Sequence, residues 1–299
     1  MCRFDESVRL RTQPAAALAI LALALAPPAA AAEPALVPFP FGDAYGDESG
    51  ARAIQSDGHR FLVWRQARDA HRIFDEDTRQ VRDVQTPPNC GVVDAAPNIA
   101  LVHCAGEGSL NPHLLYLRSG ALVPARRRED LESHHGYREI GRHWIRGGYT
   151  SPTTQKPVDA YLNWRTGELR ASYEGAFDLD DPGLAPRPNG VVAREGDYTL
   201  RTPGRSGGRT LVLDRARHGR VSLSKCPREP DCLAPSLSAG IVTWSEQGGL
   251  VRAYDARRRR FFEWHPRGSE FFGTLYVTHT RRRVLTYAGA GPVWARIRK

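Results

Sequence analysis

Short apolar runs recur along the chain and are separated by turns rich in glycine, aspartate and asparagine. The clearest example begins with the apolar run at 241–244, which a Gly-Gly turn connects to an alternating segment at 250–254. Asp255 and four arginines then lead to an aromatic segment at 261–265. Alternation between turn residues is typical of antiparallel strands. The pattern therefore predicts a unit of short antiparallel strands with no helix of useful length.

This unit recurs down the whole chain. Apolar runs equivalent to 241–244 end at residues 64, 103, 145, 200, 244 and 287, and the longest step separates the third from the fourth. A further strand and a tight turn follow each run, and the first five units then have a fourth strand. About four strands at a period of about 40–50 residues are typical of a β-propeller blade. We expect an all-β, six-bladed propeller as a single domain over residues 33–299.

The last unit stops after its third strand, at 293–297, and so lacks a fourth. Residues 35–39 precede the first unit and have no other predicted partner. We expect this N-terminal strand to complete the last blade, because a closed ring removes the exposed sheet edges of an open array. Pro38 fits an outermost strand, where its missing N–H costs little.

Residues 56–64 read Ser-Asp-Gly-His-Arg-Phe-Leu-Val-Trp. This resembles the Ser-Pro-Asp-Gly turn and following apolar strand of the TolB-like six-bladed propellers, within the wider group of WD-repeat-like folds. The other five units lack the signature. The resemblance covers 33–299 as architecture and implies no catalytic residue and no partner.

The first 32 residues have the features of a secretory signal peptide. Three arginines precede an apolar stretch at 15–26, and Ala30, Ala31 and Ala32 offer a small-residue cleavage site before Glu33. The apolar stretch is too short for a membrane span. We therefore expect cleavage after Ala32 and a secreted or periplasmic product that does not span the membrane.

Four cysteines remain after the leader, and they form two close pairs. Cys90 and Cys104 stand opposite each other in a hairpin centred on residue 97, and Cys226 and Cys232 enclose a short loop. An even number of cysteines in an exported chain predicts disulfides. The alternative of a metal site needs Cys-x2-Cys or partnering histidine spacings, which the sequence lacks. We expect two disulfides, with no metal and no cofactor.

The formal net charge is +9, and all but three of the 42 basic residues are arginine. In a propeller, the turns between first and second strands and between third and fourth strands open on one face. The arginines in these turns predict a basic face that suits an anionic envelope polymer or an acidic protein. Ordinary solvated turn arginines are the alternative, and no motif indicates specific nucleic-acid binding. The residues of this basic face are Arg79, Arg118, Arg165, Arg217, Arg257, Arg258, Arg259, Arg260, Arg281, Arg282 and Arg283.

First strands line the central channel of a propeller, so their polar residues are the candidates for chemistry. They are mixed in type, without a repeated acid, and no hydrolase motif or phosphate-binding loop is present. The acidic stretch at 178–181 favours an aspartate-capped turn over a Ca²⁺ site. The tryptophans predict packing between blades, with Trp164 the most exposed. The candidate channel-lining residues are Gln55, Asp94, Glu139, Asn189, Arg194 and His279.

The missing motifs favour a non-catalytic binding module for a cell-envelope or extracellular partner. The alternative is a propeller enzyme that acts on a glycan or lactone through the channel-lining residues. A structural component of a larger exported assembly is a third interpretation. The sequence does not decide among the three.

Overall fold

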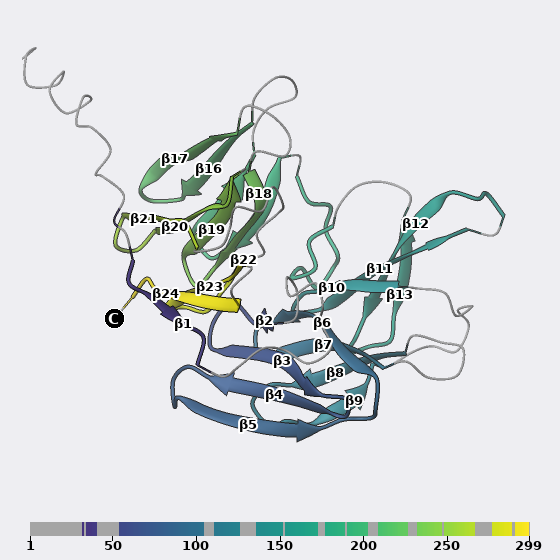
Figure 1. Cartoon of the computed structure of the whole chain (residues 1–299). Helices are drawn as coiled ribbons and strands as arrows, with labels where there is room; N and C mark the ends of the chain where they lie inside the picture. The colour runs from purple at the N-terminus through teal and green to yellow at the C-terminus, as the bar shows by residue number, and fades with distance from the viewer. Residues whose placement is uncertain are drawn as a thin grey trace, which may run out of the picture.

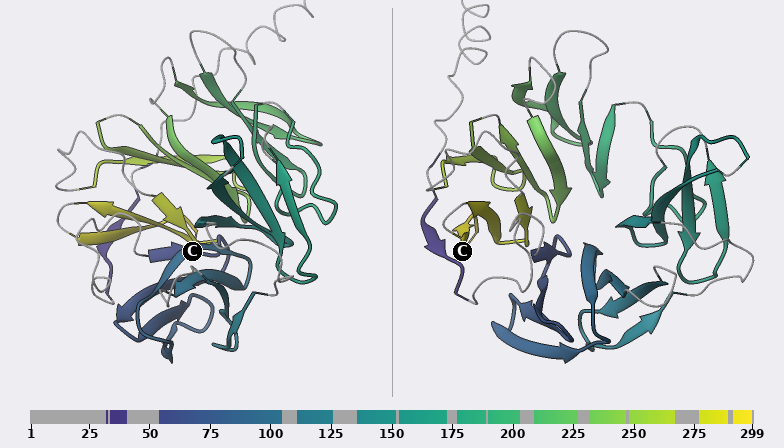
Figure 2. Two further views of the ribbon diagram at one scale, coloured as in Figure 1. Left: turned by 90° about the vertical axis from the view of Figure 1, so that its right-hand side faces the viewer. Right: turned by 45° about the vertical axis from the view of Figure 1, so that its right-hand side comes forward.

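The computed structural model describes residues 32, 34–40, 54–104, 111–125, 136–151, 153–172, 177–188, 190–202, 209–226, 232–246, 248–266, 277–288 and 291–298. In these ranges the chain forms strands and turns, with no helix. The strands build six four-stranded antiparallel sheets that stand in a ring (Figures 1 and 2). The prediction of an all-β, six-bladed propeller is confirmed.

The first three blades follow one another along the chain. From the inner to the outer strand, blade 1 consists of β2 (Ile54–Ser56), β3 (Phe61–Ala67), β4 (Ala70–Asp75) and β5 (Gln80–Gln85). Blade 2 consists of β6 (Cys90–Ala96), β7 (Ile99–Cys104), β8 (Asn111–Tyr116) and β9 (Leu122–Pro124). Blade 3 consists of β10 (Gly136–Ile140), β11 (Trp144–Thr150), β12 (Pro157–Asn163) and β13 (Leu169–Ser172).

The remaining three blades complete the ring. Blade 4 consists of β14 (Val191–Glu195), β15 (Tyr198–Arg201), β16 (Arg209–Arg215) and β17 (Gly219–Cys226). Blade 5 consists of β18 (Cys232–Ser238), β19 (Ile241–Glu246), β20 (Leu250–Asp255) and β21 (Arg260–Trp264). Blade 6 consists of β22 (Val277–His279), β23 (Arg283–Ala288), β24 (Gly291–Arg296) and the N-terminal β1 (Leu36–Pro38).

The ring closes as the sequence predicts. Strand β1 pairs antiparallel with β24, with Leu36 opposite Ala295 and Val37 opposite Trp294 (Figure 1). Directly after β1, the buried Phe39 ring contacts Trp294 of blade 6 and Trp64 of blade 1, with ring centroids 5.3 and 5.4 Å apart. Aromatic packing across the closure therefore accompanies the strand pairing.

The tryptophans fill the spaces between blades, as expected. Trp64, Trp144 and Trp244 are completely buried, and Trp244 packs against residues of blade 4. Trp164 is the most exposed of the six tryptophans, as expected, but at 8% exposure it is still buried. Its Nε1 donates to the Gly141 carbonyl at 3.2 Å, and the Arg165 guanidinium stacks over its ring. The indole is thus covered by the turn after β10 and by the arginine of its own turn.

The long step between the third and fourth units corresponds to a segment that packs between blades 3 and 4. In this blade 3–4 connection (residues 177–188), Phe177 forms a β-bridge with Pro186. Leu179 and Leu184 pack against Trp144 of blade 3. These apolar contacts hold the connection against the blade.

Candidate functional site

A polar cavity of about 290 Å³ is lined by residues of all six blades, from the ends of the first strands and from the turns after them in blades 1–3. We call it the central cavity. A second cavity of about 600 Å³, the seam cavity, lies along blade 3, the blade 3–4 connection and blade 4. The two share Asp94, Ile140, Asp180 and Arg194 on their walls. The propeller axis is therefore not filled by apolar side chains at this face.

The structure brings most of the predicted channel residues to these walls. Gln55, Asp94, Arg194 and His279 line the central cavity, and Glu139 joins Asp94 and Arg194 in the seam cavity. Asn189 lies outside the described residues. Sequence reasoning missed a second set, which lies at the end of β14, in the turns after the first strands of blades 1 and 3, and in the blade 3–4 connection. The missed charged residues are Asp57, His59, Arg142, Asp180 and Glu195.

Register shifts in four inner strands explain how the channel residues reach the cavities. The antiparallel register slips between Val92 and Asp94 in β6, and between Tyr137 and Glu139 in β10. Equivalent shifts occur in β14 and β18. A β-bulge bends a strand and changes the direction of its side chains. Simple alternation along the first strands therefore fails at the positions that line the cavities.

Asp57 ties blade 1 to blade 2. Its Oδ1 accepts hydrogen bonds from the N–H groups of His59, Arg60 and Phe61 at 2.9, 2.7 and 2.9 Å, which caps the turn between β2 and β3. Its Oδ2 accepts from the Asn98 N–H of blade 2 at 3.2 Å. Both oxygens of this buried carboxylate are therefore engaged within the protein.

Other polar side chains tie further blades in the same way. The Asp94 Oδ2 accepts from the Ile140 N–H of blade 3 at 2.9 Å. The two Glu195 oxygens accept from the N–H groups of Ala239 and Gly240 in blade 5, at 2.7 and 2.8 Å. The Ser56 hydroxyl donates to the His279 carbonyl of blade 6 at 2.5 Å. These bonds fasten neighbouring blades at the cavity mouth.

Burial changes the protonation of two cavity groups. The pKa of Asp94 is raised to about 7, mainly by burial. Hydrogen bonds from the Ile140 and Ala95 N–H groups lower the pKa, and the charge of Glu139 raises it. Burial also lowers the pKa of His279 to about 4, so this imidazole is neutral at pH 7. Asp94 is therefore a cavity carboxyl group whose protonation changes near neutral pH.

Two arginines of the central cavity, unlike its carboxylates, have side chains without hydrogen-bond partners among the described residues. Arg142 and Arg194 expose their side chains, and within the described residues neither guanidinium has a hydrogen bond or ion pair. By contrast, Arg187 on the wall of the seam cavity donates to the Val192 carbonyl at 3.2 Å. Arg146 pairs with Glu139 at 3.2 Å. Among the described residues, these two guanidinium groups are therefore donors without an acceptor.

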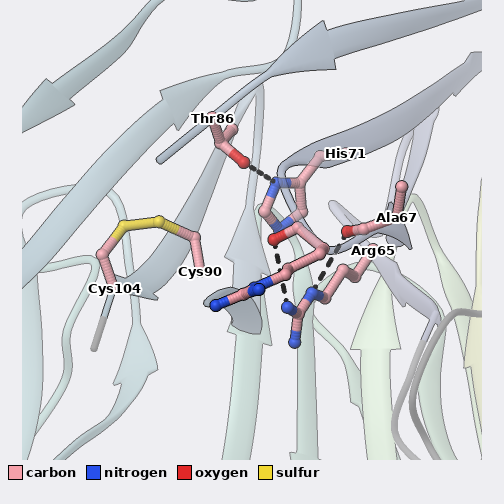
Figure 3. The surroundings of a disulfide bond; sticks show 7 residues. Arg65, Ala67, His71, Thr86, Cys90 and Cys104 are labelled. Atoms are coloured by element: carbon pink, nitrogen blue, oxygen red, sulfur yellow. Dashed lines mark hydrogen bonds between the residues drawn. A yellow bond between two sulfur atoms is a disulfide. The ribbon is translucent and has the colours of Figure 1, made fainter. Parts of the chain in front are cut away.

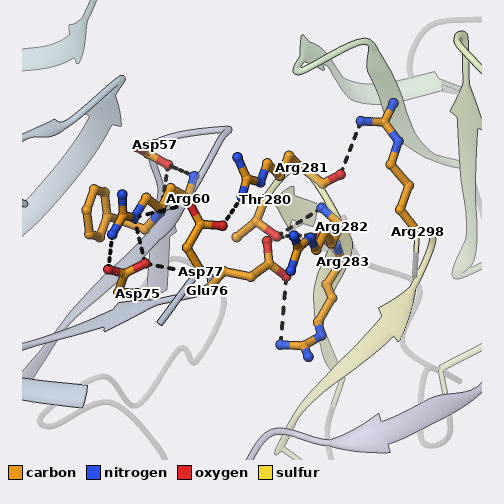
Figure 4. Close-up of polar contacts among 11 residues, drawn as sticks. Asp57, Arg60, Asp75, Glu76, Asp77, Thr280, Arg281, Arg282, Arg283 and Arg298 are labelled. Atoms are coloured by element: carbon orange, nitrogen blue, oxygen red, sulfur yellow. Dashed lines mark hydrogen bonds and ion pairs between the residues drawn. The ribbon is translucent and has the colours of Figure 1, made fainter. Parts of the chain in front are cut away.

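The arginines of the predicted basic face differ in exposure. Arg281 and Arg283 lie between blades 6 and 1 (Figure 4). Arg281 forms an ion pair with Asp77, and the Arg283 Nη1 lies 3.7 Å from the Oε1 of the buried Glu76. Arg281, Arg282 and Arg283 are partly buried. The remaining arginines of the basic face are exposed: Arg79, Arg118, Arg165, Arg217, Arg257, Arg258, Arg259 and Arg260.

The acidic stretch at 178–181 forms a capped turn. The Asp181 Oδ1 accepts from the N–H groups of Gly183 and Ala185 at 2.7 and 3.3 Å, and the Asp178 Oδ1 accepts from the Asp180 N–H at 3.0 Å. Within the described residues, no group of three His, Cys, Asp or Glu side chains is placed to hold a metal ion.

Cys90 and Cys104 form a disulfide between directly opposed positions of β6 and β7, as predicted (Figure 3). Nearby, the fully buried His71 accepts or donates one hydrogen bond through Nδ1 to the Thr86 hydroxyl at 3.1 Å. Burial lowers its pKa to about 4, so it stays neutral. The side chains of Cys226 and Cys232 lie outside the described part of the chain, and the second bridge stays a prediction.

Comparison with known proteins leaves the chain without an assigned family. No protein-family model matches the sequence. No curated protein matches it either. One similar solved structure is described as the crystal structure of the computationally designed Ika8 protein, crystal packing No.1 in P63. It is 16% identical, with a TM-score of 0.34, and the match covers 85% of this chain and 73% of that one.

The fold and the site together define a six-bladed β-propeller with a polar cavity at one face. Among the described residues, no helix is long and apolar enough to cross a membrane.

Proposed function

We propose that this protein is an exported, non-catalytic binding module that engages a cell-envelope or extracellular partner through the face of the central cavity. The observation that carries the proposal is the use of the cavity carboxylates. Both carboxylate oxygens of Asp57 and of Glu195 accept hydrogen bonds from backbone N–H groups. Three of these N–H groups, those of Asn98, Ala239 and Gly240, belong to a neighbouring blade. These acids build a rigid mouth instead of a set of free reactive groups.

Two further features support the export part of the proposal. The disulfide between Cys90 and Cys104 is typical of an oxidising compartment. Residues 1–32 have the signal-peptide pattern.

The exposed arginines around the mouth extend the proposal to an anionic envelope polymer or an acidic protein surface. Arg257, Arg258 and Arg259 stand together in one exposed turn of blade 5. Summed positive potential attracts anionic partners from a distance and weakens with salt. Binding to anionic envelope material that did not weaken between low and high salt would contradict this extension.

The test uses capture from an envelope extract by the mature chain, with one variant that blocks the cavity. Ala95→Phe places a ring into the central cavity, whose wall includes Ala95. Val81→Phe adds the same ring on the outer strand of blade 1, where Val81 is 38% exposed. We expect Ala95→Phe to lose the captured partner and Val81→Phe to retain it. Equal capture by both variants would place the binding surface elsewhere.

One observation favours the alternative of a propeller enzyme. A carboxyl group with a pKa near neutrality at a cavity is typical of a general acid or base, and the pKa of Asp94 is about 7. The residues described as lining the two cavities include no Phe, Tyr or Trp on which a sugar could stack. Hydrolysis of a glycan or lactone panel that Asp94→Asn abolishes would establish this alternative.

A further inference from the structure

The junction between blades 3 and 4 is built differently from the other junctions described at the cavity mouth. Side chains of Asp57, Asp94 and Glu195 reach directly to the next blade. Between blades 3 and 4 the hydrogen bonds run through the connection: the Asp180 Oδ1 accepts from the Arg142 N–H at 2.8 Å. The seam cavity lies along this same junction.

One arginine stands on each side of the junction. Arg142 follows β10 of blade 3, and Arg194 lies in β14 of blade 4. Both line the central cavity, and Arg194 also lines the seam cavity. Both side chains are exposed, and in the described part of the chain neither guanidinium has an acceptor. A guanidinium presents several N–H donors that match a carboxylate.

The acids on the same walls are already engaged. Asp94 and Asp180 accept backbone N–H groups, and Glu139 is paired with Arg146. Among the described residues of the walls, the groups with unused hydrogen-bonding capacity are therefore mainly the guanidinium groups of Arg142 and Arg194. We propose that Arg142 and Arg194 together bind the carboxylate of a small polar ligand where the central cavity meets the seam cavity. This inference rests on the proposed binding function and names the ligand class.

The surrounding charge narrows the class to ligands with a single anionic group. Asp57, Asp180 and Glu195 line the central cavity together with the two arginines, and their carboxylates repel a second anionic group on the ligand. The walls offer polar groups and no aromatic platform among the described residues. A volume of about 290 Å³ suits a small molecule. Hydroxyl or ammonium groups beside the carboxylate fit these walls better than apolar groups.

The experiment titrates the full mature chain with defined probes and follows binding by calorimetry and ligand-detected NMR. Galacturonate carries one carboxylate with hydroxyls, glycylglycine carries one carboxylate with an ammonium, and galactose is the neutral control. Inorganic phosphate represents a more highly charged anion. We expect galacturonate or glycylglycine to bind, galactose not to bind, and phosphate to bind at least about tenfold more weakly.

Substitutions then locate the site. We expect Arg142→Gln and Arg194→Gln each to weaken the bound carboxylate probe by about tenfold or more, and Arg194→Lys to weaken it less. Arg142→Gln retains the backbone N–H that Asp180 accepts. Arg68→Gln changes an exposed arginine in the turn between β3 and β4, outside the basic face and both cavities; it is the matched control and should bind as the unmodified chain does. Equal melting temperatures of the variants show that folding is intact.

Three results would overturn the inference: no carboxylate probe binds the unmodified chain, both glutamine variants bind unchanged, or Arg68→Gln weakens binding as much as they do. The broader binding function fails separately. If Ala95→Phe abolishes partner capture while the double variant Arg142→Gln, Arg194→Gln captures normally, the binding module stands and the carboxylate class is rejected.

Discussion

Arg298 holds the buried carboxylate of Asp255 through two parallel hydrogen bonds of 2.7 Å, one from Nε and one from Nη2. Arg298 follows β24 of blade 6, and Asp255 ends β20 of blade 5. The same guanidinium donates to the carbonyls of Ala239 and Gly240 at 2.9 and 3.3 Å. Asp255 is fully buried. One arginine therefore fastens the last blade to its neighbour.

Arg298→Ala leaves the Asp255 charge buried without its partner. Removal of one member of a buried ion pair costs about 3–5 kcal/mol, so we expect a loss of that size in the free energy of unfolding by urea. Arg258→Ala, at an exposed position in the adjacent turn, is the control and should change stability by less than about 0.5 kcal/mol. Equal effects of the two substitutions would show that the pair does not hold the blades together.

Phe39→Ala tests the closure of the ring. Phe39 is 7% exposed and packs between Trp64 and Trp294, so its truncation leaves a cavity at the junction of blades 1 and 6. We expect a loss of about 3–4 kcal/mol. Val37→Ala is the control within the same N-terminal segment, because Val37 is 49% exposed. Thermal and urea unfolding measure both, and a Phe39→Ala protein as stable as Val37→Ala would contradict the closure.

Gly141→Ala tests the docking of the blade 3–4 connection. A Cβ at Gly141 would lie 2.5–2.6 Å from Leu179, including its backbone. Leu179 can move away only by breaking the bonds that its carbonyl accepts from His143 and Trp144. We expect about 1–3 kcal/mol of destabilisation and faster amide exchange at 177–188. Gly91→Ala, where a Cβ meets nothing within 4 Å, should show neither effect.

Reduction of the disulfide between Cys90 and Cys104 should destabilise the fold. The bond closes a loop with a sequence separation of 14, and a loop of this length contributes about 3 kcal/mol by restricting the unfolded chain. We expect dithiothreitol to lower the urea midpoint of the unmodified chain. A Cys90→Ser, Cys104→Ser double variant should start from a lower midpoint and lose less on reduction. An unchanged midpoint in the unmodified chain under reducing conditions would contradict a stabilising bridge.

Asp94 should make stability depend on pH near neutrality. Its pKa is about 7 in the folded protein against 3.8 for an ordinary aspartate, so the folded state holds a proton that the unfolded chain releases. Stability therefore falls as pH rises from about 4 to about 7. After allowance for solvent screening we expect a loss of about 1–3 kcal/mol. Glu139, Arg194, Glu195 and His279 are the other ionisable groups of the described inner strands that line the cavities.

The control for this pH dependence is a pair of isosteric substitutions. Asp94→Asn keeps an oxygen for the Ile140 N–H and should remove the slope between pH 5 and 7, measured as the difference from the unmodified chain at each pH. The hydrogen bond and charge of Arg72 lower the pKa of the exposed Asp83, so Asp83→Asn should leave that slope in place. A slope that survives in Asp94→Asn would assign the proton to another group.

Period and alternation along the chain were sufficient to predict the propeller. Turn residues and apolar runs are local signals, so the six repeats and the pairing of residues 35–39 with the last blade followed from them directly. The opposition of Cys90 and Cys104 followed from the same hairpin register. The enclosed position of Trp164 did not follow from local signals, because it depends on the Gly141 carbonyl, which accepts from the indole, and on the Arg165 guanidinium, which lies over the ring.

The candidate site was likewise predictable in part from local sequence signals, while the rest depends on the fold. The positions of Asp94, Glu139 and Arg194 in the first strands were sufficient to predict them as cavity residues. The contacts that determine their protonation and hydrogen bonding could not be predicted in this way. Only the folded ring bends the inner strands at their bulges and turns Asp57 and Glu195 toward the backbone of other blades. It also leaves Arg142 and Arg194 without acceptors in the described residues. Strand identity depends on neighbours in sequence, whereas protonation and free hydrogen-bonding capacity depend on groups that approach from distant parts of the chain.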